Sequence, residues 1–108
     1  MSKYGNKRII VDGIRFDSIR EANRWQELKL LERAGVVRDL QRQVIFELLP
    51  QCKVCGKTLR KKSYIADFVY LDERGNQVIE DAKGVRTQVY QLKRHMMMWL
   101  YGIEVVEV

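Results

Sequence analysis

Two short runs of strand-forming residues, separated by a tight turn, constrain this chain more than any other feature. Residues 64–71 and 77–83 are rich in β-branched and aromatic side chains, and Glu73-Arg74-Gly75-Asn76 lies between them. A three-residue loop ending at Gly75 pairs Asp72 with Asn76, since glycine suits the left-handed position after a type I turn. This register places Asp67 directly opposite Asp81 on one face. A four-residue loop would instead place Asp67 opposite Ala82.

The facing carboxylates predict a metal site. Asp67 and Asp81 repel each other unless a cation lies between them, and hard oxygen ligands select Mg²⁺ or Mn²⁺. Lys83 lies two residues after Asp81 and therefore shares its face, where an ammonium could orient a water or balance a phosphate. A polar hairpin with a surface ion pair is the alternative interpretation of these residues taken alone.

The N-terminal third predicts a hairpin and a helix. Arg8–Val11 and Ile14–Phe16 flank Asp12-Gly13, which is a strong two-residue turn signal. Ser18 and Glu21 form an S-x-x-E capping box that starts a helix, and Gly35 ends it after Ala34. Two roles are open for Glu21. It reaches back to the Ser18 backbone, or it points toward the core edge from the face that carries Trp25 and Leu28.

The rest of the chain predicts two more strands and a second helix. Gln43–Leu49 is the first core strand, and Gln43 either faces the carboxylates or is an idle edge residue. Thr87 caps a helix that ends at Gly102, and Ile103–Val108 forms the last strand. We expect one apolar stripe of this helix to pack on the sheet, formed by Val89, Leu92, Met96 and Trp99 or Leu100.

Residues 51–62 form an insert loop between strands. Its Cys52-x-x-Cys55-Gly motif has the spacing of half a zinc site. Zinc needs four ligands, so it would require a second chain, or His95 plus another ligand. Otherwise the motif is a reduced loop. The insert also holds the densest basic cluster, which either contacts a phosphate backbone or is simply solvated: Lys53, Lys57, Arg60, Lys61 and Lys62.

Length and charge limit the classes of protein that fit. A chain of 108 residues forms one domain, 1–108, and a net charge of +6 favours a polyanionic partner. No apolar run approaches the roughly 20 residues that cross a membrane, and no signal peptide is apparent, which predicts a cytoplasmic protein. A hydrophobic content of 46% with one proline argues against disorder.

The order helix, three strands, helix, strand, with D…DxK at the end of the third strand, resembles the PD-(D/E)xK nuclease superfamily. Ala66 replaces the usual proline before Asp67. The resemblance implies a restriction-endonuclease-like α/β fold: an αβββαβ core with a mixed four-stranded sheet and an N-terminal accessory hairpin. Five segments are also similar to a family of small phage and prophage proteins, once catalogued as a domain of unknown function and grouped with Holliday-junction-resolvase-like endonucleases: YGNKRIIVDGIRFDSIREANRW, DLQRQVIFELLP, YIADFVY, VIEDAKGVRT and YQLKRHMM.

The resemblance implies a Mg²⁺- or Mn²⁺-dependent DNA endonuclease, encoded by a phage or prophage and acting as a homodimer in the bacterial cytoplasm, with a preference for branched DNA. The metal ligands would be Asp67, Asp81, the Ala82 carbonyl and Glu21, and Lys83 would position the attacking water. Gln91 and Lys93 would lie near the substrate phosphate. Two alternatives are a non-catalytic DNA-binding or phage-assembly protein that keeps the fold, and a zinc-knuckle interaction module.

Overall fold

A computed structural model describes residues 9–108 of the chain. It contains two helices, α1 (Ile19–Arg33) and α2 (Gln88–Tyr101). The strands are β1 (Ile9–Val11), β2 (Ile14–Phe16), β3 (Arg38–Leu49), β4 (Cys52–Val54), β5 (Lys57–Leu59), β6 (Lys62–Leu71), β7 (Gln77–Asp81) and β8 (Val105–Glu107). The predicted N-terminal hairpin is present as β1 and β2, whereas Arg8, the first residue predicted for it, lies outside the described residues.

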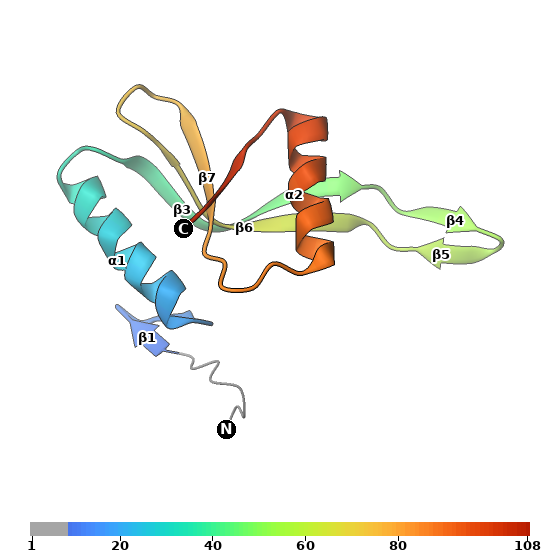
Figure 1. Ribbon diagram of the computed structural model, residues 1–108, viewed down its shortest axis with the longest axis horizontal. Helices are drawn as coiled ribbons and strands as arrows, with labels where there is room; N and C mark the ends of the chain where they lie inside the picture. The colour runs from blue at the N-terminus through green and yellow to red at the C-terminus, as the bar shows by residue number, and fades with distance from the viewer. Residues whose placement is uncertain (1–8) are drawn as a thin grey trace.

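The central sheet has four strands in the order β3-β6-β7-β8. β3, β6 and β7 are antiparallel to their neighbours, and β8 runs parallel to β7, so the sheet is mixed and the fold is α/β as expected. β3 begins at Arg38 and not at Gln43 as predicted. The two helices lie over different parts of the β3–β6 pair, with β7 between them (Figure 1).

Helix α1 is positioned by an apolar cluster and by one buried ion pair. Trp25 and Leu28 are buried against Phe16 and Phe68. On the same side of the sheet, Arg24 donates to both carboxylate oxygens of Glu80, at 2.8 and 2.6 Å. These contacts set the rotation of α1 over β6 and β7, and therefore the direction in which the first turn of the helix presents its side chains.

Helix α2 begins and ends as predicted, with Thr87 as N-cap and Gly102 in the left-handed region. Of the predicted packing stripe, Met96 is partly buried against the cluster under α2, but the other predicted members are exposed and the prediction is wrong for them. Tyr90 and Met97 are the buried residues of α2, whereas Leu92 is 60% and Trp99 83% exposed. Apolar residues occur around most of this helix, so their spacing matches more than one face, and only packing on the sheet selects the buried one.

The long β3–β6 pair bends where Gln43 faces Asp67. Residues two apart on a regular strand share a face, yet Ala66 packs in the cluster under α2 and Phe68 in the cluster under α1. Gln43 has a left-handed φ of 51°, which is uncommon for a non-glycine residue and interrupts regular pleating. The carboxylate predicted on β6 therefore lies at a corner of the sheet between the two helices.

The insert predicted as a loop is a β-hairpin. β4 and β5 are antiparallel, with Cys52 opposite Leu59 and Val54 opposite Lys57, and they form a sheet of their own. This β4–β5 arm (residues 52–59) projects from the body of the molecule as an extension of β3 and β6 (Figure 1). Neither helix in residues 9–108 is long and apolar enough to cross a membrane.

Candidate active site

The predicted register of the β6–β7 hairpin is confirmed. Phe68 pairs with Glu80, and the Asp72 amide donates to the Asn76 carbonyl at 2.9 Å, which closes the three-residue loop. Gly75 takes the left-handed φ of 81° that this loop requires. Just beyond the paired residues, the Ala82 amide donates to Asp67 Oδ2 at 2.9 Å. Asp67 and Asp81 are therefore held side by side at the end of β7.

Asp81 is almost completely buried, and both of its carboxylate oxygens have partners. Lys83 Nζ lies 3.3 Å from Oδ1, and the Tyr64 hydroxyl donates to Oδ2 at 2.5 Å. Lys83 Nζ also lies over the ring of Tyr90, 4.4 Å from its centroid, where a cation is attracted to the aromatic face. Both the carboxylate and the ammonium of the D-x-K motif are thus fixed by tyrosines from β6 and α2.

Gln43 joins Glu21 to Asp67. Its Nε2 donates to Glu21 Oε1 at 3.1 Å and to Asp67 Oδ1 at 3.2 Å. The Ser18 hydroxyl accepts from the Glu21 amide, so half of the capping box is present, but the Glu21 carboxylate turns toward Gln43. Arg42 Nη2 lies 3.8 Å from the same carboxylate. Of the two roles open to Glu21, its contacts favour the one toward the site.

The carboxyl groups carry unfavourable electrostatics. Burial first, and then the charge of Asp81, raise the pKa of Asp67 to about 7, while the hydrogen bond from the Ala82 amide opposes this rise. Burial also raises the pKa of Glu21, against the lowering effect of Arg42. Three carboxyls share this region with the cations of Lys83 and Arg42. The carboxyl groups of this region therefore outnumber its cations.

The donor set suits a hard divalent cation, although not through the three predicted carboxylates together. Within residues 9–108 no group of three or more His, Cys, Asp or Glu side chains is close enough to hold a metal. The Gln43 amide lies between Glu21 and Asp67. Asp67 and Asp81 are the pair that could share an ion, and the Ala82 carbonyl lies beside them. The Gln43 side chain separates Glu21 from this pair.

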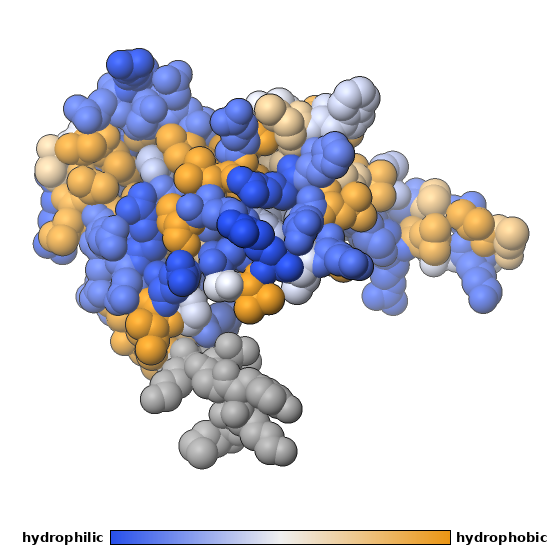
Figure 2. All heavy atoms as spheres, in the orientation of Figure 1, coloured by the Kyte–Doolittle hydropathy of each residue, from blue (hydrophilic) through white to orange (hydrophobic). Residues whose placement is uncertain are grey.

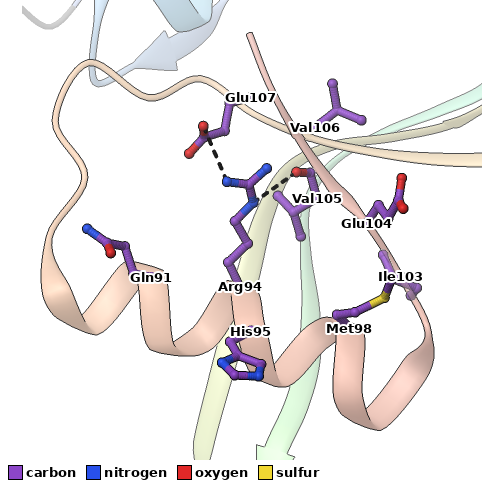
Figure 3. A pocket seen from close by; sticks show the side chains of 9 residues that line it. All are labelled: Gln91, Arg94, His95, Met98, Ile103, Glu104, Val105, Val106 and Glu107. Carbon is purple, nitrogen blue, oxygen red and sulfur yellow. Dashed lines mark hydrogen bonds and ion pairs between the residues drawn. The ribbon is translucent and has the colours of Figure 1, made fainter.

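The residues predicted to contact a phosphate backbone lie in other places. Lys53, Lys57, Arg60, Lys61 and Lys62 are exposed along the β4–β5 arm and its base. Lys93 is half-buried on α2. Gln91 lines an open groove of about 740 Å³ between α2 and β8, together with Arg94 and His95 (Figure 3).

That groove is separate from the site of Asp67 and Asp81, and contacts between residues of the chain cross it. Arg94 Nε donates to the Val105 carbonyl at 3.2 Å, and its Nη1 lies 3.4 Å from Glu107 (Figure 3). Arg86 also bonds Glu107, and this is the main cause that lowers the pKa of Glu107 to about 2. The arginine charges in this region are therefore already paired with a carboxylate of the chain.

Sequence reasoning left Gln43 undecided and missed Tyr64, Tyr90 and Arg42. Tyr64 is three residues before Asp67, which on a straight strand would put it on the opposite face. The bend at Gln43 and Asp67 brings it to Asp81. The sequence held one signal for a residue in the place of Gln43, because any strand antiparallel to β6 must place one residue opposite Asp67.

A family model described as "Protein of unknown function (DUF1064)" matches residues 1–105. The chain belongs to this family. The DUF1064 match includes both helices, β3, β6 and β7, and hence every residue of the carboxylate site. No curated protein and no solved structure matches the chain.

Proposed function

We propose that this DUF1064 chain is a metal-dependent deoxyribonuclease that hydrolyses phosphodiester bonds on a restriction-endonuclease-like αβββαβ core. The proposal is carried by one observation: Asp67 and Asp81 face each other on neighbouring strands, with Lys83 3.3 Å from Asp81. Burying two carboxylates together is costly without a cation, and a lysine on the same edge is suited to ordering a water beside a phosphate. The order α1, β3, β6, β7, α2, β8 supports the same assignment.

Asp67 and Asp81, with the Ala82 carbonyl, would hold Mg²⁺ or Mn²⁺, and Glu21 would contribute through water. A bound ion of this kind stabilises charge on the phosphoryl oxygens and lowers the pKa of a coordinated water. Lys83 positions the attacking water, because Asp81 and the Tyr90 ring hold its ammonium in place.

The neighbouring polar side chains keep the two carboxylates in one orientation. Tyr64 donates to Asp81, while Gln43 and the Ala82 amide donate to Asp67. Each of these oxygens keeps a further lone pair for a cation. The left-handed Gln43 is consistent with a strained residue retained at a functional site.

DNA would be held largely by charge. The basic residues of the β4–β5 arm and its base are exposed, and the arm projects from the body of the molecule (Figure 1), which suits a phosphate-contacting surface. Such contacts position a duplex without reading its sequence. This favours selection by DNA structure, in line with junction-resolving endonucleases, in a phage or prophage setting.

The test is cleavage of labelled four-way junction, flap, linear duplex and single-stranded DNA with Mg²⁺ or Mn²⁺. We expect cutting of at least one of these by the wild type. Asp81→Asn and Lys83→Ala should lower the rate by about 100-fold or more, because both remove groups that act at the reacting phosphate. Thermal melting and DNA binding are measured for each variant, so that a loss of folding is recognised.

The matched control is Glu73→Gln. It removes a carboxylate from the same hairpin, but at an exposed turn position. Cutting should be unchanged. Absence of metal-dependent cutting on every substrate, with DNA binding retained, would overturn the nuclease and favour the DNA-binding alternative.

A further inference from the structure

One face of helix α2 is apolar but is not turned toward the sheet. Val89, Leu92 and Trp99 are 62%, 60% and 83% exposed, and Met96, which lies between them, is partly buried. These four residues, the α2 stripe, are the ones predicted to pack on the sheet, which instead buries another side of the helix. A row of large apolar side chains in water is unfavourable and is typical of a surface that binds a partner.

The spacing of the α2 stripe fits a second helix. Its residues follow one another at intervals of three, four and three, which is the alternation of the a and d positions in a helix seam. Side chains at these intervals form a ridge along the helix that interdigitates with the side chains of a facing helix. A strand has a period of two and does not match this ridge. The partner that the stripe fits is therefore a helix.

The sizes of the residues fit a second copy of α2 that runs in the opposite direction. A two-fold axis midway between Leu92 and Met96 sets each of them against the other in the second copy. The same axis sets Val89, the smallest residue of the stripe, against Trp99, the largest. A parallel pair would instead set two tryptophans together at one end and two valines at the other, which packs less evenly. Antiparallel helices also place their opposite dipole ends together.

Charge does not oppose this pairing. Arg94 lies about 200° around the helix from Leu92. It points toward β8, where it contacts Glu107 (Figure 3). Figure 2 shows strongly hydrophilic side chains between β7 and α2, on this side of the helix. Beside the stripe lie Lys93, which is half-buried, and His95. Two copies that each carry a net charge of +6 would thus meet through a surface of low charge.

The area of the α2 stripe is sufficient for a dimer. Trp99 alone presents on the order of 200 Å² of surface. The whole stripe presents roughly 500 Å² per copy, or about 1,000 Å² for two copies, which is the lower bound of specific interfaces. We propose that two copies of this chain associate through antiparallel pairing of their α2 stripes. The resemblance to nucleases implies a homodimer but names no surface, and this surface follows from α2 alone, whatever reaction the carboxylates perform.

The experiment measures the mass of the full-length protein by sedimentation or light scattering, in EDTA and without DNA, from micromolar to millimolar concentration. We expect a reversible doubling of mass as the concentration rises. Leu92→Glu should weaken association by about 100-fold or more, because it places a charge in the middle of the seam in both copies.

The matched control is Leu30→Glu, since Leu30 is 63% exposed and lies on α1. It should associate as the wild type does, and thermal melts of both variants should show that each is folded. A mass of one chain at every concentration would overturn the proposal and leave the stripe to a helix of another protein. Equal dissociation constants for Leu92→Glu and the wild type would overturn it as well.

Disulfide crosslinking tests the direction of the pair in a Cys52→Ser/Cys55→Ser background. The two native cysteines do not share a metal ion, because Cys52 lies in regular strand opposite Leu59 and Cys55 lies in the turn, three residues later. Under mild oxidation, copies with Val89→Cys should crosslink to copies with Trp99→Cys. Copies with Val89→Cys should not crosslink to each other, because ten residues of helix, about 15 Å, separate their thiols in an antiparallel pair. Crosslinking of like with like would overturn the antiparallel arrangement. Neither readout is cleavage, so the outcome is independent of the proposed nuclease.

Discussion

Replacing Asp67 by asparagine separates the charge of the site from its hydrogen bonds. The folded-state pKa of Asp67 is raised from 3.8 to about 7, so the folded protein holds this proton more tightly than the unfolded chain does. Stability linked to Asp67 is complete at acidic pH and is lost as the pH rises through about 7. Asparagine does not titrate. Its effect on stability must therefore change with pH.

The magnitude follows from the part of the shift that lies between pH 5 and pH 8. About two pH units separate pH 5 from the folded-state pKa, which corresponds to ~2.7 kcal/mol for a fully buried carboxyl. Asp67 is only half-buried, and solvent screening reduces this to about 1.5 kcal/mol. In metal-free buffer the variant should thus gain stability relative to wild type by about 1.5 kcal/mol between pH 5 and pH 8, or roughly 6–10 °C in Tm for a domain of this size.

The assay is urea unfolding of wild type and Asp67→Asn in EDTA at both pH values. Asparagine disturbs the hydrogen bond from Gln43 equally at pH 5 and pH 8, so this cost cancels in the difference. Glu73→Gln, at the exposed turn, should show no such change. An equal stability difference for Asp67→Asn at both pH values would refute the reasoning. Mn²⁺ at pH 8 should stabilise wild type and not the variant.

Two further predictions concern packing. Arg24→Ala leaves the Glu80 carboxylate buried without its cation and should lower the free energy of unfolding, measured by chemical denaturation, by about 3–5 kcal/mol. The control Arg20→Ala loses only an exposed hydrogen bond to the Val108 carbonyl and should lower it by less than about 1 kcal/mol. A loss below about 1 kcal/mol for Arg24→Ala would contradict the role assigned to this pair. On α2, Met97→Ala should destabilise by about 2–5 kcal/mol and Trp99→Ala by less than about 1 kcal/mol, because Met97 is fully buried and Trp99 is 83% exposed. Thermal melts in which Trp99→Ala is the more damaging change would show that the other face of α2 packs on the sheet.

The central hairpin could be predicted because its signals are local. Gly75 supplies the left-handed residue that a three-residue loop needs, and this loop sets the register from Asp72 back to Asp67. Period-two alternation then places Lys83 on the face of Asp81. The contact of 3.3 Å between these two residues follows from the same rule.

The surroundings of the carboxylates could not be predicted in this way. Gln43 lies between Glu21 and Asp67 because α1, β3 and β6 meet at a bend, and no spacing along the chain encodes that meeting. The same bend turns Tyr64 toward Asp81 against strand alternation. The capping-box pattern correctly predicted the Ser18 cap. The hydrogen bond from Gln43 that orients the Glu21 side chain, however, joins segments that are far apart in the chain.

The sequence by itself determined the elements whose interactions are local: two capped helices, the β1–β2 and β6–β7 hairpins, and the pairing of Asp67 with Asp81. Turn glycines and capping hydroxyls act within a few residues, so their effect is independent of the rest of the fold. Tertiary structure decided which side of α2 is buried and which polar groups surround the carboxylates. Those outcomes depend on the free energy of packing segments that are far apart in the chain, and several faces of α2 are apolar enough to compete until the sheet selects one.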